Sequence, residues 1–181
     1  MDYQSFRNLE WIEGNLTQRG KYAQIAVAAA LQRAGAGVSD IQLVEGFDLK
    51  VRYEGRDYGL EVKTTTGDRI SLQQKDLDDV RKVRSEGLEP GFSVLRLTAG
   101  AQWWISRPEP IEVEKERSGA KTLTMRPTAF RAAPLAELQK AVRQHFDDVL
   151  DEAVRHMKKR GFASDANLGL SDLKTALDLD V

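Results

Sequence analysis

The sequence predicts an α/β domain built as helix, three strands, helix and strand, with an extra β-hairpin and a long C-terminal helix. Three observations predict this class. An Ala-rich apolar segment at residues 20–34 has helical spacing. Apolar and polar residues alternate over residues 48–53 and 57–63, as in half-buried strands. Apolar residues recur every three or four positions over residues 134–159, as on one face of an amphipathic helix.

The first helix is apolar over more than half of its circumference, so we expect it to be largely buried. Gly35 and Gly37 end it, because glycine readily adopts the backbone conformation that closes a helix. The three strands expected next lie at residues 39–44, 48–53 and 57–63. Residues 54–56, Glu-Gly-Arg, indicate a tight hairpin turn between the last two of these strands.

The second half of the chain is expected to hold a charged helix, two more hairpins and the long helix. Ser71 is the expected N-cap of the charged helix. The expected elements are a loop at 64–69, a helix at 72–87, a hairpin of 92–97 with 102–106, a hairpin of 111–116 with 121–125, and a helix at 134–159. The hairpins turn at Ala99-Gly100 and Ser118-Gly119, and leucines after residue 167 are spaced for a short packed helix.

This order of elements divides the 181 residues into an N-terminal extension (1–17), an α/β core with added hairpins (18–131) and a C-terminal helical extension (132–181). The 27 Lys and Arg residues nearly balance the 28 Asp and Glu residues, so global charge gives no argument for nucleic-acid binding. The absence of cysteine excludes disulfides, Fe–S clusters, thiolate zinc and cysteine nucleophiles. The sequence shows no secretory signal or membrane span, so we expect a cytoplasmic protein.

Three charged residues converge if residues 48–63 form a hairpin. Glu61 and Lys63 are two positions apart on one strand, so their side chains lie on the same face. A turn at Glu54-Gly55 places Asp48 opposite Glu61, whereas a turn at Gly55-Arg56 places it opposite Lys63. In both registers the three side chains share one face of the sheet.

Two neighbouring carboxylates provide the oxygen ligands that a hard divalent cation such as Mg²⁺ or Mn²⁺ prefers. Such a cation polarises a phosphoryl group and neutralises developing charge. A lysine beside it can position an attacking water and stabilise negative charge on the scissile phosphate. Asp48, Glu61 and Lys63 therefore suit the hydrolysis of phosphodiester bonds.

Asp48, followed twelve residues later by Glu61-Val62-Lys63, resembles the signature of the PD-(D/E)xK nuclease superfamily. The order of elements resembles the restriction-endonuclease-like core, with its α-β-β-β-α-β mixed sheet. The stretches GFDLKV and LEVKTT are especially similar to archaeal Holliday junction resolvase-type domains. The resemblance covers about residues 18–98 and implies a metal-dependent endonuclease that acts on DNA, including branched or damaged DNA, with a possible homodimer.

The resemblance also implies roles for individual residues. Asp48, Glu61 and the Val62 carbonyl would bind Mg²⁺ or Mn²⁺, and Lys63 would be the catalytic lysine. Gln73 would contact the water or a ligand, and the residues expected to contact nucleic acid are Lys21, Thr64, Gln74 and Lys75. The chain departs from the family pattern at two positions. Phe47 stands where many members have proline, and Gln24 stands where many have a glutamate on the first helix.

Three other groups of residues have both a functional and a structural interpretation: the cations Arg81, Lys82 and Arg84, the adjacent Trp103 and Trp104, and the histidines His145 and His156. The cations alternate with aspartates, which favours a solvated helix face over a phosphate-binding one. One tryptophan is expected in the core, and the other either packs on a neighbouring element or stacks on bases. The histidines are expected at the surface or at helix caps.

Two further functional classes compete with the enzyme. One is a nucleic-acid-binding module that keeps the nuclease fold without catalysis, which Gln24 and the near-neutral charge favour. The other is an interaction domain without a nucleic-acid partner, which only the amphipathic C-terminal helix favours. Metal binding and salt-sensitive DNA binding distinguish the three classes.

Overall fold

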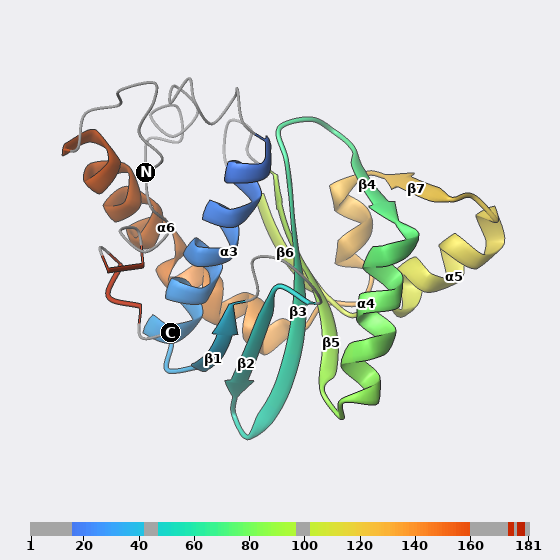
Figure 1. Cartoon of the computed structure of the whole chain (residues 1–181), viewed down its shortest axis with the longest axis horizontal. Coiled ribbons are helices and arrows are strands. Elements are labelled where there is room, and N and C mark those ends of the chain that lie inside the picture. The colour runs from blue at the N-terminus through green and yellow to red at the C-terminus, as the bar shows by residue number, and fades with distance from the viewer. Residues whose placement is uncertain (1–15, 42–46, 97–101, 160–173, 176, 180–181) are drawn as a thin grey trace.

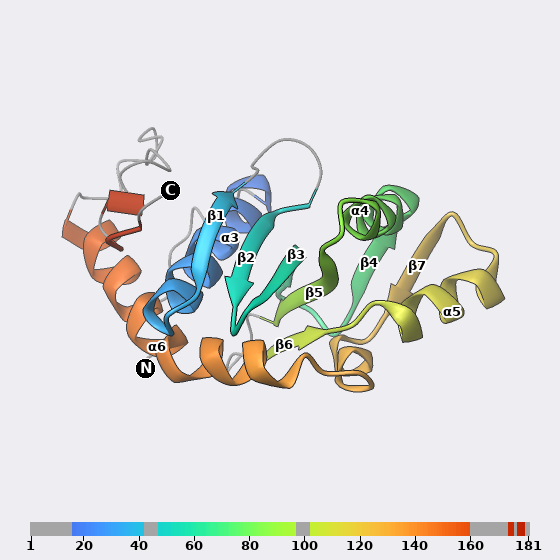
Figure 2. The same ribbon diagram turned by 90° about the horizontal axis from the view of Figure 1, so that it is seen from below.

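The computed structural model describes residues 16–41, 47–96, 102–159, 174–175 and 177–179. A mixed five-stranded sheet in the order β1-β2-β3-β5-β6 forms its centre (Figures 1 and 2). These strands are β1 (Gly37–Ile41), β2 (Leu49–Tyr53), β3 (Arg56–Thr65), β5 (Glu89–Arg96) and β6 (Gln102–Ser106). Strands β3 and β5 are parallel, and the other neighbouring pairs of this sheet are antiparallel.

Helices cover both faces of this sheet (Figure 1). α3 (Leu16–Arg33) and α6 (Ala136–Lys159) pack on one face and share an apolar core with it. α4 (Gln74–Ser85) and the 3-10 helix η1 (Pro127–Arg131) pack on the other face. This second face also carries a small sheet of β4 (Ile70–Gln73) and β7 (Thr122–Met125). α5 (Glu109–Ser118) directly precedes β7. The α/β class with a mixed sheet is therefore confirmed.

The two adjacent tryptophans of β6 show how the sheet separates two cores. Trp103 packs in the first core with its ring centroid 4.7 Å from that of Phe146 on α6. Trp104 packs in the second core, where the Arg131 guanidinium lies 5.3 Å from its ring centroid. The prediction that they face opposite ways is confirmed. Both are at least 95% buried, so neither is open for base stacking.

The hairpin between β2 and β3 has a two-residue turn at Glu54-Gly55. Both turn residues have positive φ, 49° and 79°, which matches the right-handed twist of the flanking strands. Tyr53 pairs with Arg56 and Leu49 with Leu60. Of the two registers that the sequence allowed, the structure has the one that places Asp48 opposite Glu61.

The helix predicted at 72–87 begins two residues later than expected, and Ser71 is not its N-cap. Ile70 and Leu72 are buried while Ser71 and Gln73 are exposed, so residues 70–73 form strand β4. Gln73 is the N-cap, and α4 starts at Gln74. The alternation of only four residues is too short to be distinguished from the start of a helix by sequence alone.

The third predicted hairpin is wrong. Residues 109–118 form helix α5, in which Ile111 is buried and Val113 is 65% exposed. A strand at 111–116 would have placed both on the same side, so the helix is what separates them. β7 exists close to its predicted position, but its partner is β4, with Gln73 paired to Thr122 and Ile70 to Met125.

Most of the other predicted elements are present with shifted ends. β1 starts two residues before its predicted strand, and β3 extends to Thr65, into the predicted loop. β5 and β6 pair as the expected antiparallel hairpin, although the turn at Ala99-Gly100 lies outside the described residues. Residues 1–15 of the predicted N-terminal extension and most of the leucine-rich tail also lie outside them, whereas residues 16–17 belong to α3. Leu177 and Leu179 of the tail are described and buried in the first core. None of the described helices is long and apolar enough to cross a membrane.

Candidate active site

Asp48 and Glu61 face each other across the start of the β2–β3 hairpin. Asp48 directly precedes β2, and its backbone N–H donates to the Leu60 carbonyl over 2.9 Å. The last pair of this register is Leu49 with Leu60, and Asp48 and Glu61 are the next residues beyond it on the two segments. Directly opposed side chains of an antiparallel pair lie about 4.5–5.5 Å apart at Cβ. The turn at Glu54-Gly55 thus brings two carboxylates together from thirteen positions apart in the sequence.

The Asp48 carboxylate is fixed by a hydrogen bond to each oxygen. The Val62 backbone N–H donates to Oδ2 over 2.6 Å. The Gln24 side-chain Nε2, from α3, donates to Oδ1 over 2.6 Å. The Gln24 amide oxygen is then left buried without a hydrogen-bond partner. One side chain of the first helix therefore orients Asp48 and also presents an unpaired acceptor.

Glu61 is only 6% exposed, although it is a carboxylate on the central strand β3. Its Oε1 accepts an ion-paired hydrogen bond from Lys63 Nζ at 2.7 Å. Its Oε2 is buried and has no hydrogen-bond partner. A buried carboxylate oxygen without a donor is energetically costly, so this atom marks a position where a cation or donor would be stabilising.

Lys63 is held by a second carboxylate that the sequence analysis did not assign to the site. Asp76 of α4 accepts a hydrogen bond from Lys63 Nζ at 2.8 Å through Oδ1. Its Oδ2 accepts the backbone N–H of Gln73, the N-cap, at 2.6 Å. Asp76 stands at the third position of α4, where an acidic residue commonly reaches back to the cap. Had the helix start been placed at Gln74, this position would have been recognisable.

Burial dominates the electrostatics of the two opposed carboxylates. It raises the pKa of Asp48 to about 6, against the lowering effect of the Val62 N–H and of Lys63. Burial and the neighbouring Asp48 charge raise the pKa of Glu61 to about 8. For Lys63, burial alone would lower the pKa, but the Glu61 and Asp76 charges outweigh it and the pKa is raised. The two neighbouring carboxylates thus favour the ammonium form of Lys63.

The donor atoms at this position fit one hard divalent cation. Two opposed carboxylates, with the unpaired Glu61 Oε2 and Gln24 Oε1, form a set of oxygen donors of the kind that Mg²⁺ prefers. The described residues contain no group of three or more His, Cys, Asp or Glu side chains placed to hold a metal ion. Two carboxylates would therefore supply all the negative charge around a bound cation, and neutral oxygens would have to complete its coordination shell.

The other predicted site residues lie around this centre. Thr64 follows Lys63 on β3 and is half-buried, and Lys21 lies one turn before Gln24 on α3. Gln73, predicted on a helix, instead ends β4 and has an exposed side chain. Gln74 and Lys75 are exposed on the first turn of α4. The exposure of Gln73, Gln74 and Lys75 suits contact with a ligand outside the protein, although it does not identify one.

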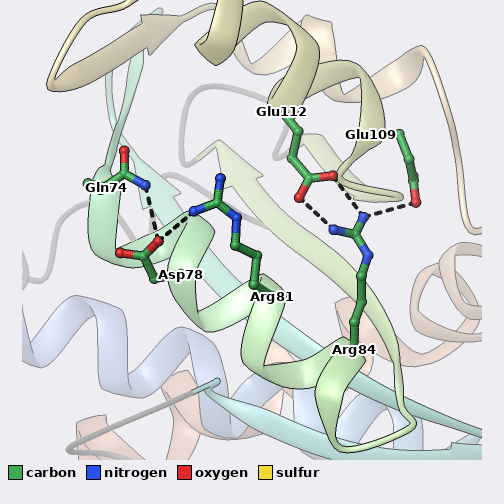
Figure 3. Close-up of polar contacts among 6 residues, drawn as sticks. All are labelled: Gln74, Asp78, Arg81, Arg84, Glu109 and Glu112. Atoms are coloured by element: carbon green, nitrogen blue, oxygen red, sulfur yellow. Dashed lines mark hydrogen bonds and ion pairs between the residues drawn. The ribbon is translucent and has the colours of Figure 1, made fainter.

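Two arginines of α4 are engaged with neighbouring carboxylates (Figure 3). Arg81 forms an ion pair with Asp78 at 2.9 Å. Arg84 reaches across to α5, where it lies 2.6 Å from Glu112 and 3.2 Å from Glu109. Arg84 therefore joins α4 to α5, and neither arginine is a free cation. His145 is half-buried on α6, and the side chain of His156 lies outside the described residues.

A solved structure with the same fold is the Holliday junction resolvase Hjc of Archaeoglobus fulgidus, an archaeal hyperthermophile. The two are similar with a TM-score of 0.53 at 16% sequence identity, over 67% of this chain and 96% of the resolvase chain. The fold is restriction-endonuclease-like. No protein-family model matches the chain, and no curated protein matches it. The restriction-endonuclease-like core thus accounts for two thirds of the chain, and at this identity the similarity establishes the fold alone.

Proposed function

We propose that this protein is a metal-dependent endonuclease of the PD-(D/E)xK type, which hydrolyses phosphodiester bonds in DNA. The observation that carries the proposal is the opposition of Asp48 and Glu61 on the hairpin, with Lys63 Nζ 2.7 Å from Glu61. The restriction-endonuclease-like fold and the similarity to a Holliday junction resolvase support it. Branched DNA is accordingly the first substrate to test, and dimer formation stays a prediction.

In this proposal Asp48 and Glu61 bind Mg²⁺ or Mn²⁺, with the Val62 carbonyl and the Gln24 amide oxygen as neutral candidates. The bound ion would polarise the phosphoryl group and neutralise part of its charge. Lys63 keeps its proton, so its ammonium donates to the attacking water or to a phosphate oxygen and stabilises negative charge there. Asp76 keeps this ammonium beside Glu61. Gln73, at the N-cap of α4, is proposed to contact the water or the phosphate.

A cleavage assay tests this assignment on plasmid and four-way-junction DNA with Mg²⁺ or Mn²⁺. We expect cleavage by the wild type and a loss of about 10³-fold or more in Glu61→Ala and Lys63→Ala, because each removes charge stabilisation specific to the transition state. Asp57→Ala is the matched control, since Asp57 is a half-buried carboxylate on the same strand that pairs with Arg52 away from the site. Full cleavage by both folded site variants would contradict the assignment.

A second candidate function is DNA binding without catalysis. Gln24 favours it, because an amide stands on the first helix where a third carboxylate would strengthen metal binding. Isothermal titration with Mn²⁺ separates the two functions. The endonuclease predicts heat of binding that Asp48→Asn abolishes, whereas the binding module predicts no metal binding together with salt-sensitive retention of DNA.

A further inference from the structure

The small sheet of β4 and β7 has two different faces. Ile70, Leu72 and Leu123 are buried against the second core. The other face is exposed and presents the directly paired side chains of Ser71 with Thr124 and of Gln73 with Thr122. The Ser71 and Thr124 hydroxyl oxygens lie 3.3 Å apart, within hydrogen-bond distance. We name this outward face, with the two arginines described next, the ribbon face.

Arginines extend this row at one end. Arg69 is two residues before Ser71, and Arg126 is two residues after Thr124, so strand alternation places both on the outward side. Arg126 has extended backbone angles, φ −75° and ψ 142°, which continue the alternation. Both arginines are exposed, and within the described residues neither belongs to an ion pair.

Hydrogen bonds hold the loop that presents Arg69. The Thr65 hydroxyl donates to the Arg69 carbonyl over 2.8 Å and accepts the Gly67 backbone N–H over 3.0 Å. Arg96 Nε, from β5, donates to the Gly67 carbonyl over 3.0 Å. Because three bonds fix this short connection, the position of Arg69 is ordered before any partner binds, and binding costs less conformational entropy.

The ribbon face is complementary to a phosphate backbone. Its six residues are Arg69, Ser71, Gln73, Thr122, Thr124 and Arg126, which carry two positive charges, no negative charge and a hydrogen-bonding group at every position. Arginine, serine, threonine and glutamine are among the side chains that contact DNA phosphates. The row from Arg69 to Gln73 spans about 13 Å, or about four steps of one DNA strand at about 3.4 Å each.

The ribbon face also leads directly to the candidate active site. Gln73 ends β4, and its backbone N–H is bound by Asp76, whose other oxygen holds Lys63. A DNA strand bound along the ribbon face would therefore reach Lys63, which acts on the scissile phosphate in the proposed mechanism. Arg81 and Arg84 of α4 offer no comparable surface, because both are paired with carboxylates (Figure 3).

We propose that the ribbon face binds the sugar–phosphate backbone of duplex DNA beside the active site. This inference rests on the proposed function, since it names the surface that would hold the substrate. It assigns sequence-independent affinity to Arg69 and Arg126 and positioning to the hydroxyl and amide side chains between them. It predicts that both arginines contribute to the salt dependence of binding, because each neutralised phosphate releases counterions.

The test measures the affinity for labelled duplex DNA in EDTA, by fluorescence anisotropy at several salt concentrations. In Arg69→Ala/Arg126→Ala we expect about tenfold weaker binding and a slope of log K against log salt that is smaller by about 1.8, at about 0.9 per lost phosphate contact. Thr124→Glu, which places a carboxylate among these groups, should also weaken binding, whereas Thr124→Gln should not.

The matched control is Arg52→Ala/Arg117→Ala, which removes the same net charge from exposed positions on β2 and α5. Thermal unfolding confirms that each variant is folded. An unchanged slope in the ribbon variant, or an equal loss in the control, overturns the inference. The binding assay in EDTA is independent of cleavage, which is measured separately with Mg²⁺ or Mn²⁺. If the wild type binds DNA through the ribbon face but does not cleave it when metal is added, only the proposed enzyme is contradicted. If the ribbon variant binds as tightly as a wild type that cleaves DNA, only the role of the ribbon face is contradicted.

Discussion

Two of the antiparallel strand pairs, the β2–β3 ribbon and the β4–β7 ribbon, differ in burial, in charge and in how far apart their strands lie in the sequence. The β2–β3 ribbon is local, since a two-residue turn joins its strands, and it carries Asp48, Glu61 and Lys63 in a largely buried setting. The β4–β7 ribbon pairs strands about fifty residues apart and presents an exposed face without acidic residues. The first ribbon has charges with fixed protein partners, and the second has charges without them.

This difference follows from what each task requires. A reacting phosphate needs charges whose positions are fixed and whose solvent has been removed, because electrostatic interactions are strongest there. A surface that holds a long polyanion needs cations that remain in water until the partner arrives. We therefore interpret the buried ribbon as the chemical centre and the exposed ribbon as its docking surface. Three further predictions, ordered by expected effect, test or sharpen this contrast.

The largest effect is expected from the residue that links the two ribbons. Asp76→Asn keeps an acceptor for the Gln73 N–H but replaces the anion beside Lys63 with a neutral amide. We expect cleavage to fall about 100-fold in kcat with little change in KM, a barrier increase of about 2.7 kcal/mol. Steady-state kinetics measure this.

Asp76→Glu is the conservative control, since glutamate also suits this capping position. It should recover much of the lost rate, and the unfolding temperatures of both variants should stay near the wild-type value. A parallel fall of rate and unfolding temperature in both variants would assign Asp76 a structural role only.

A smaller effect is expected where α4 packs on the buried ribbon. A Cβ at Gly59 of β3 would lie 2.7 Å from both methyl groups of Val83, so Gly59→Ala must push α4 outward. We expect a loss of about 1–3 kcal/mol in the free energy of unfolding, measured in urea. The variant with Val83→Ala added should lose less than the sum of the single changes, because the smaller side chain relieves the clash. Thr122→Ala, on the exposed ribbon, should change stability little.

The smallest effect is expected from the protonation of the two opposed carboxylates in EDTA. Because their pKa values are raised to about 6 and about 8, the folded state holds protons that the unfolded chain releases. Their contribution is therefore most favourable below about pH 4 and is lost as the pH rises through 6 and 8. Glu61→Gln should unfold about 2–4 °C above the wild type at pH 8, at about 1 kcal/mol of gain.

Differential scanning calorimetry from pH 5 to pH 9 measures this dependence. Asp57→Asn, which changes a half-buried carboxylate on the same strand, should follow the wild-type curve. If the unfolding temperatures of the wild type and of Glu61→Gln change with pH in the same way, burial does not destabilise the ionised Glu61 carboxylate, which contradicts the prediction. Added Mn²⁺ should raise the wild-type unfolding temperature more than that of Glu61→Gln.

Local patterns predicted the buried ribbon well. The positive φ values at Glu54 and Gly55 belong to a turn that glycine favours, and strand alternation then fixed which side chains share a face. The same patterns failed in the exposed ribbon. Four residues of β4 look like the start of the helix that follows, and the alternation around Ile111 belongs to a helix in which Val113 faces solvent. Pairing with the distant strand β7 makes residues 70–73 a strand, and the local spacing of apolar residues does not reveal such a pairing.

The sequence by itself determined that a hairpin brings Asp48, Glu61 and Lys63 to one face of the sheet, because a tight turn and a period of two are local properties, whereas the structure selected the register. Only the tertiary structure decided which groups surround them. Gln24 of α3 and Asp76 of α4 reach this centre because each helix packs on the sheet. The ribbon face forms because β7 pairs with β4, which lies about fifty residues earlier in the sequence. These contacts depend on apolar packing between distant segments, whose geometry is fixed by the fold as a whole.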